Sequence, residues 1–328
     1  MVLGEDFAVA TEPFRPELLA HCYRMLGSIY DAEDQVQETM VRAWRSYGEF
    51  QGRSSLRTWL HAIATNACLR AIENRARRPL PSGLGGPGED PGDLAPVLPE
   101  VRWLQPVPDA LVRPAADPAA QTVSRESVRL ALIAALQYLP GRQRAVLLLR
   151  DVLGWRAAEV AELLGTSTAA TNSILQRARE RLRQAAPAQD EVREPAEAGQ
   201  RALLDAYAAA FSNADVAGLM RLLRADAVLE MPPQPTWFAG RAAVGRFMAA
   251  RVLTRPGAFA LVPTAANGQP ALGAYVRHDG GVHRAHGITV LTVSGTRVSR
   301  ITSFNDPGLF PMFGLPGTYP GRDASATA

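Results

Sequence analysis

Residues 157 to 184 read AAEVAELLGTSTAATNSILQRARERLRQ, and this stretch predicts two helices joined by a tight turn. The first helix covers residues 157 to 164, and Gly165 supplies the left-handed backbone position at which it ends. The hydroxyl side chains of residues 166 to 168 can cap the helix that follows. Helix, glycine turn and second helix together form the helix-turn-helix layout.

The second of these helices has a buried stripe and an outward face. The buried stripe is expected to contain Thr171, Ile174, Ala178 and Leu182. The outward face carries small and amide side chains, followed by charged ones: Ala169, Asn172, Ser173, Gln176, Arg177 and Glu180. Small side chains permit a close approach to the major groove, where amides can read base edges and arginines contact phosphates. A plain helical hairpin is the alternative, but the outward pattern favours DNA.

A second long helical pattern, SSLRTWLHAIATNACLRAIENRARR, lies upstream at residues 54 to 78. Its apolar stripe recurs at three- and four-residue spacing and consists of Leu60, Ile63, Ala64, Ala67 and Ala71. The opposite side of the helix carries Trp59, Asn66, Arg70 and Arg77. Because aromatic rings stack on bases and guanidinium groups bind phosphates, this line of residues suits a nucleic-acid strand. A solvated face with a half-buried tryptophan is the alternative.

The composition indicates a multidomain globular chain with two differently charged surfaces. Its 328 residues suffice for two or three domains, and its 25 prolines and 27 glycines indicate substantial linkers. The basic residues are all arginine, which excludes Schiff-base chemistry by a lysine. Residues 31 to 38 carry four acids and no base, whereas residues 51 to 80 carry six arginines against Glu73. This contrast predicts two different partner surfaces.

Neither a metal site nor a membrane anchor is predicted. Cys22 and Cys68 stand singly in helical patterns, outside any CxxC or Cys/His cluster, which is typical of reduced packing residues. The N-terminal sequence lacks the basic start and apolar core of a signal peptide, and no apolar run approaches the roughly 18 residues of a membrane helix. We therefore expect a cytoplasmic protein without a cofactor.

Changes in composition divide the chain into segments. Ten prolines lie between residues 79 and 118, so this linker is expected to be mobile or extended. Within it, Trp103 and Leu104 could dock on a neighbouring surface. The predicted segments are a helical domain at 5–78, a Pro/Gly-rich linker at 79–121, a second helical domain at 122–184, a linker at 185–197, an α+β domain at 198–316 and a tail at 317–328.

The C-terminal domain is predicted to contain three helices, a strand at AVLEMPP (227 to 233) and an antiparallel meander. Four β-like runs are joined by short turns at AANGQ, HDGGV and VSGTR. Helices followed by a meander favour a curved sheet that wraps the helices. The apolar side chains near the end either dock on a neighbouring surface or close this domain's own sheet; they are Phe304, Leu309, Phe310 and Phe313.

Three stretches of the chain together resemble the extracytoplasmic-function (ECF) sigma factors of bacterial RNA polymerase. They are YRMLGSIYDAEDQVQETMVRAWRSY at 23 to 47, SSLRTWLHAIATNACLR at 54 to 70 and LPGRQRAVLLLRDVLGWRAAEVAELLGTSTAATNSILQRARERLR at 139 to 183. The resemblance implies two all-α sigma domains that act with core RNA polymerase on promoter DNA. The first would bind and melt the minus-ten promoter element, and the second would read the minus-thirty-five element.

The resemblance also implies roles for individual residues. Core polymerase would be bound by Asp31, Asp34, Gln35, Gln37 and Glu38. The minus-ten element would be bound by a loop that captures a flipped base and by the helix after it, through Gln51, Arg53, Ser54, Trp59, Asn66, Arg70 and Arg77. The minus-thirty-five element would be bound by Asn172, Ser173, Gln176, Arg177 and Arg179.

The last 130 or so residues resemble a SnoaL-like domain, a cone-shaped α+β barrel that also occurs in cyclases and isomerases. The resemblance implies a pocket for a small-molecule ligand, with candidate lining residues Tyr207, Trp237, Tyr275 and His286. His283 and His286 are expected to point to opposite faces of a strand, so a shared metal site is not predicted.

The sequence therefore predicts a non-enzymatic sigma factor whose C-terminal domain regulates it in cis. One alternative is a SnoaL-type cyclase or isomerase fused to a DNA-binding regulator. Another is a helix-turn-helix repressor that acts without polymerase. Dependence of promoter opening on core polymerase would distinguish the first interpretation from both alternatives.

Overall fold

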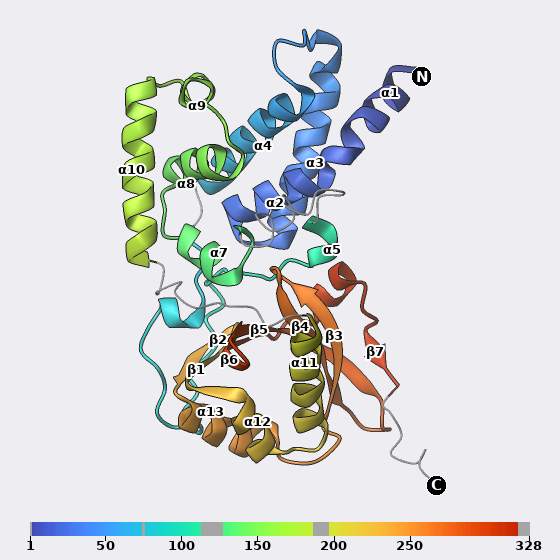
Figure 1. Cartoon of the computed structure of the whole chain (residues 1–328). Coiled ribbons are helices and arrows are strands. Elements are labelled where there is room, and N and C mark those ends of the chain that lie inside the picture. The colour runs from blue at the N-terminus through green and yellow to red at the C-terminus, as the bar shows by residue number, and fades with distance from the viewer. Residues whose placement is uncertain (1, 74–75, 113–126, 186–196, 321–328) are drawn as a thin grey trace. The chain divides into compact units, whose positions relative to one another are not determined.

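The computed structural model describes residues 2–73, 76–112, 127–185 and 197–320, and it divides into two compact units (Figure 1). The first unit is built from Met1–Arg78 and Asp109–Ala188. The second is built from Pro79–Pro108 and Gln189–Ala328. The chain therefore leaves the first unit after Arg78 and returns to it at Asp109.

The first half of the first unit is a helical bundle. Its elements are α1 (Val2–Thr11), η1 (Glu12–Phe14), α2 (Arg15–Leu26), α3 (Ile29–Ser46), η2 (Tyr47–Glu49) and α4 (Leu56–Ile72). Gly27 ends α2 in the left-handed conformation, with φ of 69°. Helix α3 begins two residues before the predicted Asp31, because the Ser28 hydroxyl caps it by accepting a hydrogen bond from the Asp31 N–H at 3.2 Å.

The apolar stripe predicted for α4 is present. Leu60, Ala64 and Ala67 are buried against α2 and α3, whereas Ile63 and Ala71 are half-buried. The polar residues His61 and Thr65 are also buried, and Cys22 and Cys68 are free thiols in the same core.

The second half of the first unit contains the predicted helix-turn-helix, which is confirmed. Its elements are α5 (Asp109–Val112), α7 (Leu130–Leu136), α8 (Gly141–Leu147) with a π-turn η4 (Leu148–Val152), α9 (Ala157–Leu163) and α10 (Thr168–Ala185). Gly165 has φ of 59° at the turn, and the Ser167 hydroxyl accepts a hydrogen bond from the Ala170 N–H at 3.1 Å. The sequence had placed the cap in this triplet.

Two buried arginines join the two halves of this unit. Arg24 on α2 donates hydrogen bonds to the Ser127 hydroxyl at 2.6 Å and to the Ser127 carbonyl at 3.3 Å. Arg144 on α8 donates to the Met25 carbonyl and to the Gln137 side chain. Burial lowers the pKa of each guanidinium to about 10. The helices that resemble separate sigma domains are therefore packed together in one unit.

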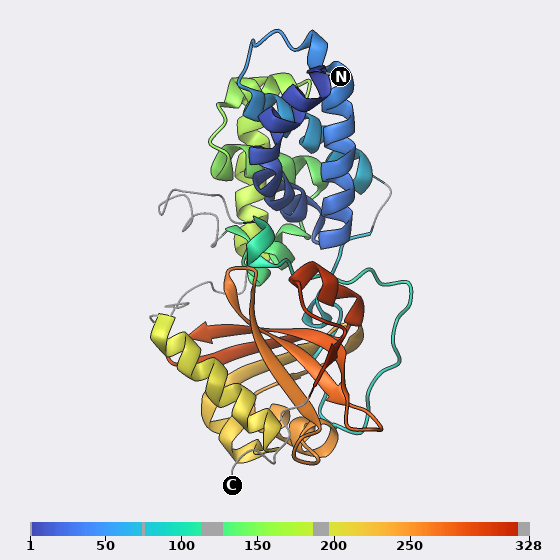
Figure 2. The ribbon, with the colours of Figure 1, turned by 90° about the vertical axis from the view of Figure 1, so that its right-hand side faces the viewer.

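The second unit is a curved sheet wrapped around a helix (Figure 2). Its helices are α11 (Glu197–Ser212), α12 (Val216–Leu222) and α13 (Arg241–Phe247), the last followed by the π-turn η5 (Met248–Val252). Its strands are β1 (Leu223–Met231), β2 (Gln234–Ala239), β3 (Phe259–Ala266), β4 (Gln269–Arg277), β5 (His283–Ser294), β6 (Arg297–Phe304) and β7 (Thr318–Tyr319), with η6 (Pro307–Phe313) before β7.

The predicted meander is confirmed over β3 to β6, and its three turns lie where the sequence placed them. The strand order is β2-β1-β6-β5-β4-β3, so β2 and β3 are the edges. The sequence reasoning missed the parallel pairing of β1 with β6, which joins segments far apart in the chain. The core lies between α11 and the concave face of the sheet and includes Tyr207, Leu272 and Leu291.

The apolar segment before the predicted tail packs on the sheet, and of the tail at 317–328 only residues 317–320 are described. Leu309 and Phe310 are fully buried, and Phe310 packs edge-on against Tyr275 on the convex face. Strand β7 then pairs with the start of β5. The apolar end of the chain therefore closes its own sheet.

The predicted linker at 79–121 also needs correction over its described part. Residues 79–108 belong to the second unit, where they form no long element but make several hydrogen bonds to the sheet. Composition correctly excluded regular structure, but it could not reveal these contacts, because they are made by backbone groups.

Candidate functional site

The outward face of α10 is open. Asn172, Ser173, Gln176 and Arg177 are exposed, whereas Thr171, Leu175 and Ala178 on the other side are buried. Ser173 turns its hydroxyl back to the Ala169 carbonyl at 3.1 Å, so its side chain stays close to the helix. This half of α10 presents short polar groups first and longer ones later, a profile that fits a major groove.

The arginines farther along α10 are not equivalent. Arg179 makes a two-pronged ion pair with Asp151, at 2.7 and 3.0 Å, and this pairing raises the pKa of Arg179. Arg183 contacts Glu180. Within the described residues, Arg177 has no ion pair. The predicted DNA residue Arg179 therefore ties α10 to the π-turn after α8, while Arg177 remains available to a phosphate.

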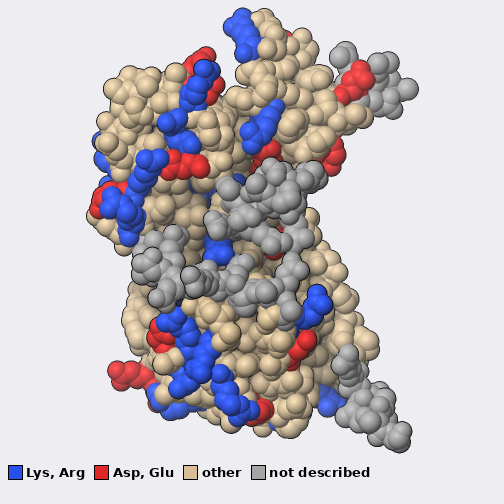
Figure 3. Space-filling view, viewed as in Figure 1, with Lys and Arg blue, Asp and Glu red and all other residues tan. Residues whose placement is uncertain are grey.

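Charged side chains are gathered over α10, with acids among the arginines (Figure 3). They border a shallow hollow of about 410 Å³ lined by Gln176, Arg177, Arg179, Glu180 and Arg183. The acids lower the net positive charge of this surface, which is therefore not a broad basic field.

The loop before α4 is the second open polar surface. Gln51, Arg53 and Ser54 are all exposed. Phe50 at its start packs on Trp59 of α4, with ring centroids 4.9 Å apart and planes tilted by 35°. The Ser55 hydroxyl caps α4 by accepting from the Thr58 N–H at 3.1 Å. The Phe50–Trp59 pair places aromatic rings directly beside this exposed polar loop. Aromatic rings next to polar side chains are typical of sites that stack single-stranded bases.

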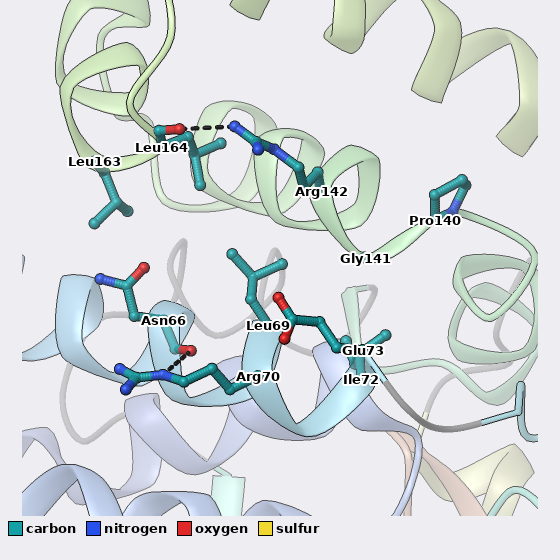
Figure 4. A pocket seen from close by; sticks show the side chains of 10 residues that line it. All are labelled: Asn66, Leu69, Arg70, Ile72, Glu73, Pro140, Gly141, Arg142, Leu163 and Leu164. Carbon is teal, nitrogen blue, oxygen red and sulfur yellow. Dashed lines mark hydrogen bonds between the residues drawn. The ribbon is translucent and has the colours of Figure 1, made fainter.

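The rest of the predicted line on α4 faces the second helical half. Asn66 and Arg70 line a cavity of about 660 Å³ whose far wall includes Pro140, Arg142 and Leu163 (Figure 4). Arg70 donates from Nε to the Asn66 carbonyl at 3.2 Å.

Arg77 likewise faces the second half, with its guanidinium carbon 4.4 Å from the centroid of the Tyr138 ring. The structure therefore does not bring the predicted minus-ten residues together on one free face. The loop residues are exposed and Trp59 is half-buried beside them, whereas Asn66, Arg70 and Arg77 face α7 to α9.

Helix α3 carries an exposed stripe that sequence reasoning found only in part. Asp34 and Gln37 are exposed as predicted, and they are followed at helical spacing by Val41 and Trp44, which are 43% and 59% exposed. Tyr30 precedes them at 37% exposure. We call these five residues the α3 stripe. Large apolar side chains at such exposure, rimmed by polar ones, are typical of protein-binding surfaces.

The other predicted polymerase-binding residues are less free. Asp31 forms an ion pair with Arg78 at 2.6 Å, and both side chains are mostly buried. Glu38 pairs with Arg42 at 2.5 Å along the same helix. The sequence analysis overlooked both cations, although Arg42 lies at the i+4 position that favours such a pair. Gln35 is half-buried.

A cluster of buried titratable groups supports α4 from beneath. His21 Nε2 lies 3.0 Å from Thr65 Oγ1, and His61 Nε2 lies 2.9 Å from Glu17 Oε1. Burial lowers the pKa of both histidines. Burial alone would raise the pKa of Glu17, but hydrogen bonds from His61 and Arg57 outweigh it and hold the pKa at about 2. The cluster therefore pairs neutral rings with an ionised carboxylate.

In the second unit, two of the four candidate pocket residues lie near each other: Tyr207 and His286 belong to one chain of ring contacts that runs through Phe211 and Phe259. Tyr207 lies in the core beside Phe211, and burial raises the pKa of its phenol. Tyr275 faces the convex side, where its hydroxyl donates to the Pro316 carbonyl at 3.0 Å.

Trp237 lies on edge strand β2 and donates from its indole to the Gly85 carbonyl at 2.9 Å. His286 lies at a bulge of β5, where register shifts between Ala274 and Tyr275, and its ring meets Phe259 edge-on. Burial lowers the pKa of His286. The sequence could not reveal which of the four residues lie together, because that depends on which face of the sheet each strand residue takes.

Among the helices that the structure describes, none combines the length and apolarity needed to cross a membrane.

Three family models match the chain. Sigma-70 region 2 matches residues 11–78, Sigma-70 region 4 matches residues 129–182, and the SnoaL-like domain matches residues 204–301. The first match contains α2 to α4, the second contains α7 to α9 and most of α10, and the third contains most of the curved sheet.

Curated relatives and a solved structure extend these matches. The chain is 52% identical over 313 residues to the ECF RNA polymerase sigma factor SigG of Mycobacterium tuberculosis, which covers 95% of this chain and 84% of that protein. It is 33% identical to SigJ of the same organism over 169 residues, or 51% of this chain and 47% of SigJ. The crystal structure of SigJ matches with a TM-score of 0.60 at 26% identity, covering 92% of this chain and 98% of that one.

Proposed function

Because the chain belongs to the ECF RNA polymerase sigma factors, which bind core RNA polymerase and promoter DNA, we propose that three surfaces of the first unit divide this work. The α3 stripe binds core polymerase. The loop at Phe50–Ser55 and the ring of Trp59 hold the minus-ten element, and the outward face of α10 reads the minus-thirty-five element. The place of action is the cytoplasm, with the polymerase.

The exposure of Asn172, Gln176 and Arg177 on one face of α10 carries this proposal. Two amides and a guanidinium on a helix that follows a tight glycine turn supply both base-edge and phosphate contacts. Arg179 acts by holding α10 through Asp151 rather than by touching DNA.

Purified chain, core polymerase and a promoter fragment test this assignment. We expect promoter opening only when core polymerase is present, and we expect substitutions in each of the three surfaces to impair a different step. Polymerase binding should depend on α3, opening on the loop before α4, and promoter choice on α10. Tight promoter binding by the free chain, unaffected by polymerase, would contradict the proposal and support a repressor.

We further propose that the SnoaL-like domain regulates the chain in cis and is not an enzyme. The positions of Tyr275 on the convex face and Trp237 on edge strand β2, both apart from Tyr207 and His286, support this. A cyclase or isomerase activity is the alternative function. Turnover of a small molecule by the full chain, abolished by His286→Ala with the fold intact, would overturn the regulatory assignment.

A further inference from the structure

Residues 79–108 lie along the sheet of the second unit and are attached to it at both ends and in the middle. At the first end, the Ser82 N–H donates to Glu230 Oε1 at 2.9 Å. Glu230 is fully buried, and its second carboxylate oxygen lies 2.5 Å from Arg300 Nη1. A buried carboxylate is costly unless its oxygens are satisfied, so the backbone of the linker completes this ion pair.

In the middle, the segment follows edge strand β2. The Gly88 N–H donates to the Trp237 carbonyl at 2.7 Å, and the Trp237 indole N–H donates to the Gly85 carbonyl at 2.9 Å. An edge strand offers unpaired backbone groups, and an extended peptide can bind by pairing with them. The linker uses this mode of recognition.

Two further bonds hold the middle of the segment beside the same strand. The Ala95 N–H donates to the Thr236 hydroxyl at 2.8 Å, and the Gln234 amide donates to the Ala95 carbonyl at 2.6 Å. Leu94 packs against the core of the sheet. Side chains and backbone of β2 therefore both contribute to the contact.

At the other end, the turn between β3 and β4 holds the segment by a pair of bonds. The Val107 N–H donates to Asn267 Oδ1 at 3.1 Å, and the Asn267 N–H donates to the Val107 carbonyl at 3.0 Å. Asn267 is fully buried and left-handed, with φ of 58°. The side-chain oxygen of Asn267 thus accepts the linker's N–H in the way that a backbone carbonyl would.

We propose that the SnoaL-like domain is a binding site for an extended peptide, and that its ligand is residues 80–108 of the same chain. The bonds above run to backbone groups at Ser82, Gly88, Ala95 and Val107, so recognition depends on the path of the peptide more than on its side chains. The apolar side chains that the segment buries lie near its two ends, at Leu80, Leu104 and Val107, whereas most of residues 82–101 is exposed or half-buried. Covalent attachment keeps the effective concentration of the segment near the millimolar range, which sustains binding of this exposed middle part. The linker therefore occupies the site in the folded chain and can still be released from it.

The docked linker restrains the two promoter-binding parts, because Arg78 and Asp109 are its covalent neighbours. A released segment of this length, at about 3.3 Å per residue, can span up to about 100 Å. The minus-ten and minus-thirty-five elements are about 25 base pairs apart, or roughly 85 Å at 3.4 Å per pair. Separation of the two parts by this distance therefore requires release of the linker together with opening of the Arg24 and Arg144 contacts between them. This consequence rests on the proposed sigma function, whereas the binding site itself does not.

A pair of glycine variants in the full chain tests the docking. A Cβ atom at Gly88 would meet Thr236 Cγ2 at 2.8 Å and Phe238 at 3.4 Å, whereas a Cβ atom at Gly86 would meet nothing within 4 Å. We therefore expect Gly88→Val to release the segment and Gly86→Val, the matched control, to leave it bound. Both substitutions restrict the unfolded chain alike.

Trypsin gives a direct readout, because Arg102 is the one arginine between residues 79 and 108 and the chain has no lysine. Cleavage after Arg102 is expected to be at least about tenfold faster in Gly88→Val than in wild type or Gly86→Val, which corresponds to a tenfold rise in the open population. Hydrogen exchange at residues 82–95 should rise in parallel. Equal cleavage of the two variants, or full-speed exchange of this segment in wild type, would overturn the proposal.

A second pair of variants tests the opposite end. Asn267→Gly keeps the left-handed turn but removes the acceptor for the Val107 N–H, whereas Asn267→Asp keeps an oxygen in its place. We expect faster exchange around Val107 in the glycine variant and protection like wild type in the aspartate variant.

Binding in trans completes the test. A synthetic peptide of residues 79–108 should bind the Gly88→Val chain, whose site is empty, and the same peptide carrying the valine should not. Binding of both peptides, or of neither, would contradict the proposal. These measurements use neither polymerase nor DNA, so a failure of docking cannot be confused with a failure of sigma activity.

Discussion

At the scale of single residues, two neighbouring arginines on α10 have different tasks. Arg179 is committed to Asp151, and Arg177 is exposed without an ion pair in the described structure. Asn172 and Gln176 share the exposed face with Arg177. The sequence alone could not separate the two arginines, because the partner of Arg179 lies 28 residues earlier in the chain.

We therefore predict distinct effects of four alanine substitutions on promoter binding by the holoenzyme. Asn172→Ala or Gln176→Ala should cost about 1–3 kcal/mol on the preferred minus-thirty-five sequence and relax the choice of base. Arg177→Ala should weaken all sequences evenly and reduce the salt dependence by about one counterion. Arg179→Ala should lower thermal stability of the α8–α10 part. Binding to a panel of promoter variants at several salt concentrations measures this, and identical losses on every promoter would contradict base reading.

The buried histidines beneath α4 make the first unit sensitive to acid. His21 and His61 have folded-state pKa values below the usual 6.5, so the unfolded chain binds more protons as pH falls through that value. Their contribution to stability is present above pH 6.5 and is lost below it. Glu17, with a pKa of about 2 against 4.5, contributes above pH 4.5 and loses that contribution as pH falls toward 2.

We predict that the α2 and α4 amides exchange faster at pH 5.5 than at pH 7.5, after correction for intrinsic rates. His21→Gln keeps a donor for Thr65 but does not titrate in this range, so it should flatten part of the pH dependence. Helix α10 of the same sample, which lies apart from this cluster in the sequence, provides the reference. An unchanged pH dependence in His21→Gln would show that these rings do not set it.

At the scale of elements, α3 shows what burial adds to a sequence pattern. Five acidic and amide residues of this helix were predicted to bind core polymerase. Two of them are paired within the chain, Asp31 with Arg78 and Glu38 with Arg42. The apolar members of the α3 stripe were missed because, in sequence, an exposed tryptophan cannot be told from a core one. Helix α3 buries the side chains from Ile29 to Ala43 that recur at helical spacing, and Trp44 lies on the opposite side, so it points outward.

We predict that Trp44→Ala lowers affinity for core polymerase at least about tenfold, because a large exposed aromatic is a typical anchor of an interface. Asp34→Arg should lower the association rate by reversing the charge. Val9→Ala on α1 and Glu162→Arg on α9 are matched controls, since both side chains are exposed outside the stripe. Binding is measured without DNA, and wild-type affinity in both stripe variants would remove α3 from the interface.

Local signals predicted the elements that depend on local geometry. The glycine turn, its hydroxyl cap and the two faces of α10 follow from residues within a few positions of each other. The three hairpin turns of the meander follow from glycine in the same way. Pairing of β1 with β6 and docking of the linker on β2 join distant segments through backbone bonds, which leave little trace in side-chain periodicity. Glu230 within the strand-like AVLEMPP was a usable signal, because a carboxylate among apolar residues needs a partner.

At the scale of the whole molecule, packing of η6 determines whether the SnoaL-like domain stays folded. Leu309 and Phe310 cover the convex face of β4 and β5, and each is fully buried. Burial of each side chain stabilises by about 1.5–3 kcal/mol. The sum, about 3–6 kcal/mol, is a large share of the roughly 5–15 kcal/mol that a domain possesses. The segment from η6 to β7 is therefore part of the barrel.

We accordingly predict that a chain ending at Asp306 loses the folded barrel and with it the docking of residues 80–108. Trypsin should cut this chain after Arg102 as fast as it cuts Gly88→Val, and polymerase-dependent transcription should shift toward that of a chain ending at Ala198. A chain ending at Pro320 keeps η6 and β7 and is the control, so it should resemble the full chain in both assays. The three truncations separate two effects: loss of the barrel frees the linker, and the freed linker changes how far the promoter-binding parts can separate. If the chain ending at Asp306 keeps a protected linker and full-length transcription, the convex-face packing does not support the peptide site, and the coupling between barrel and promoter recognition fails with it.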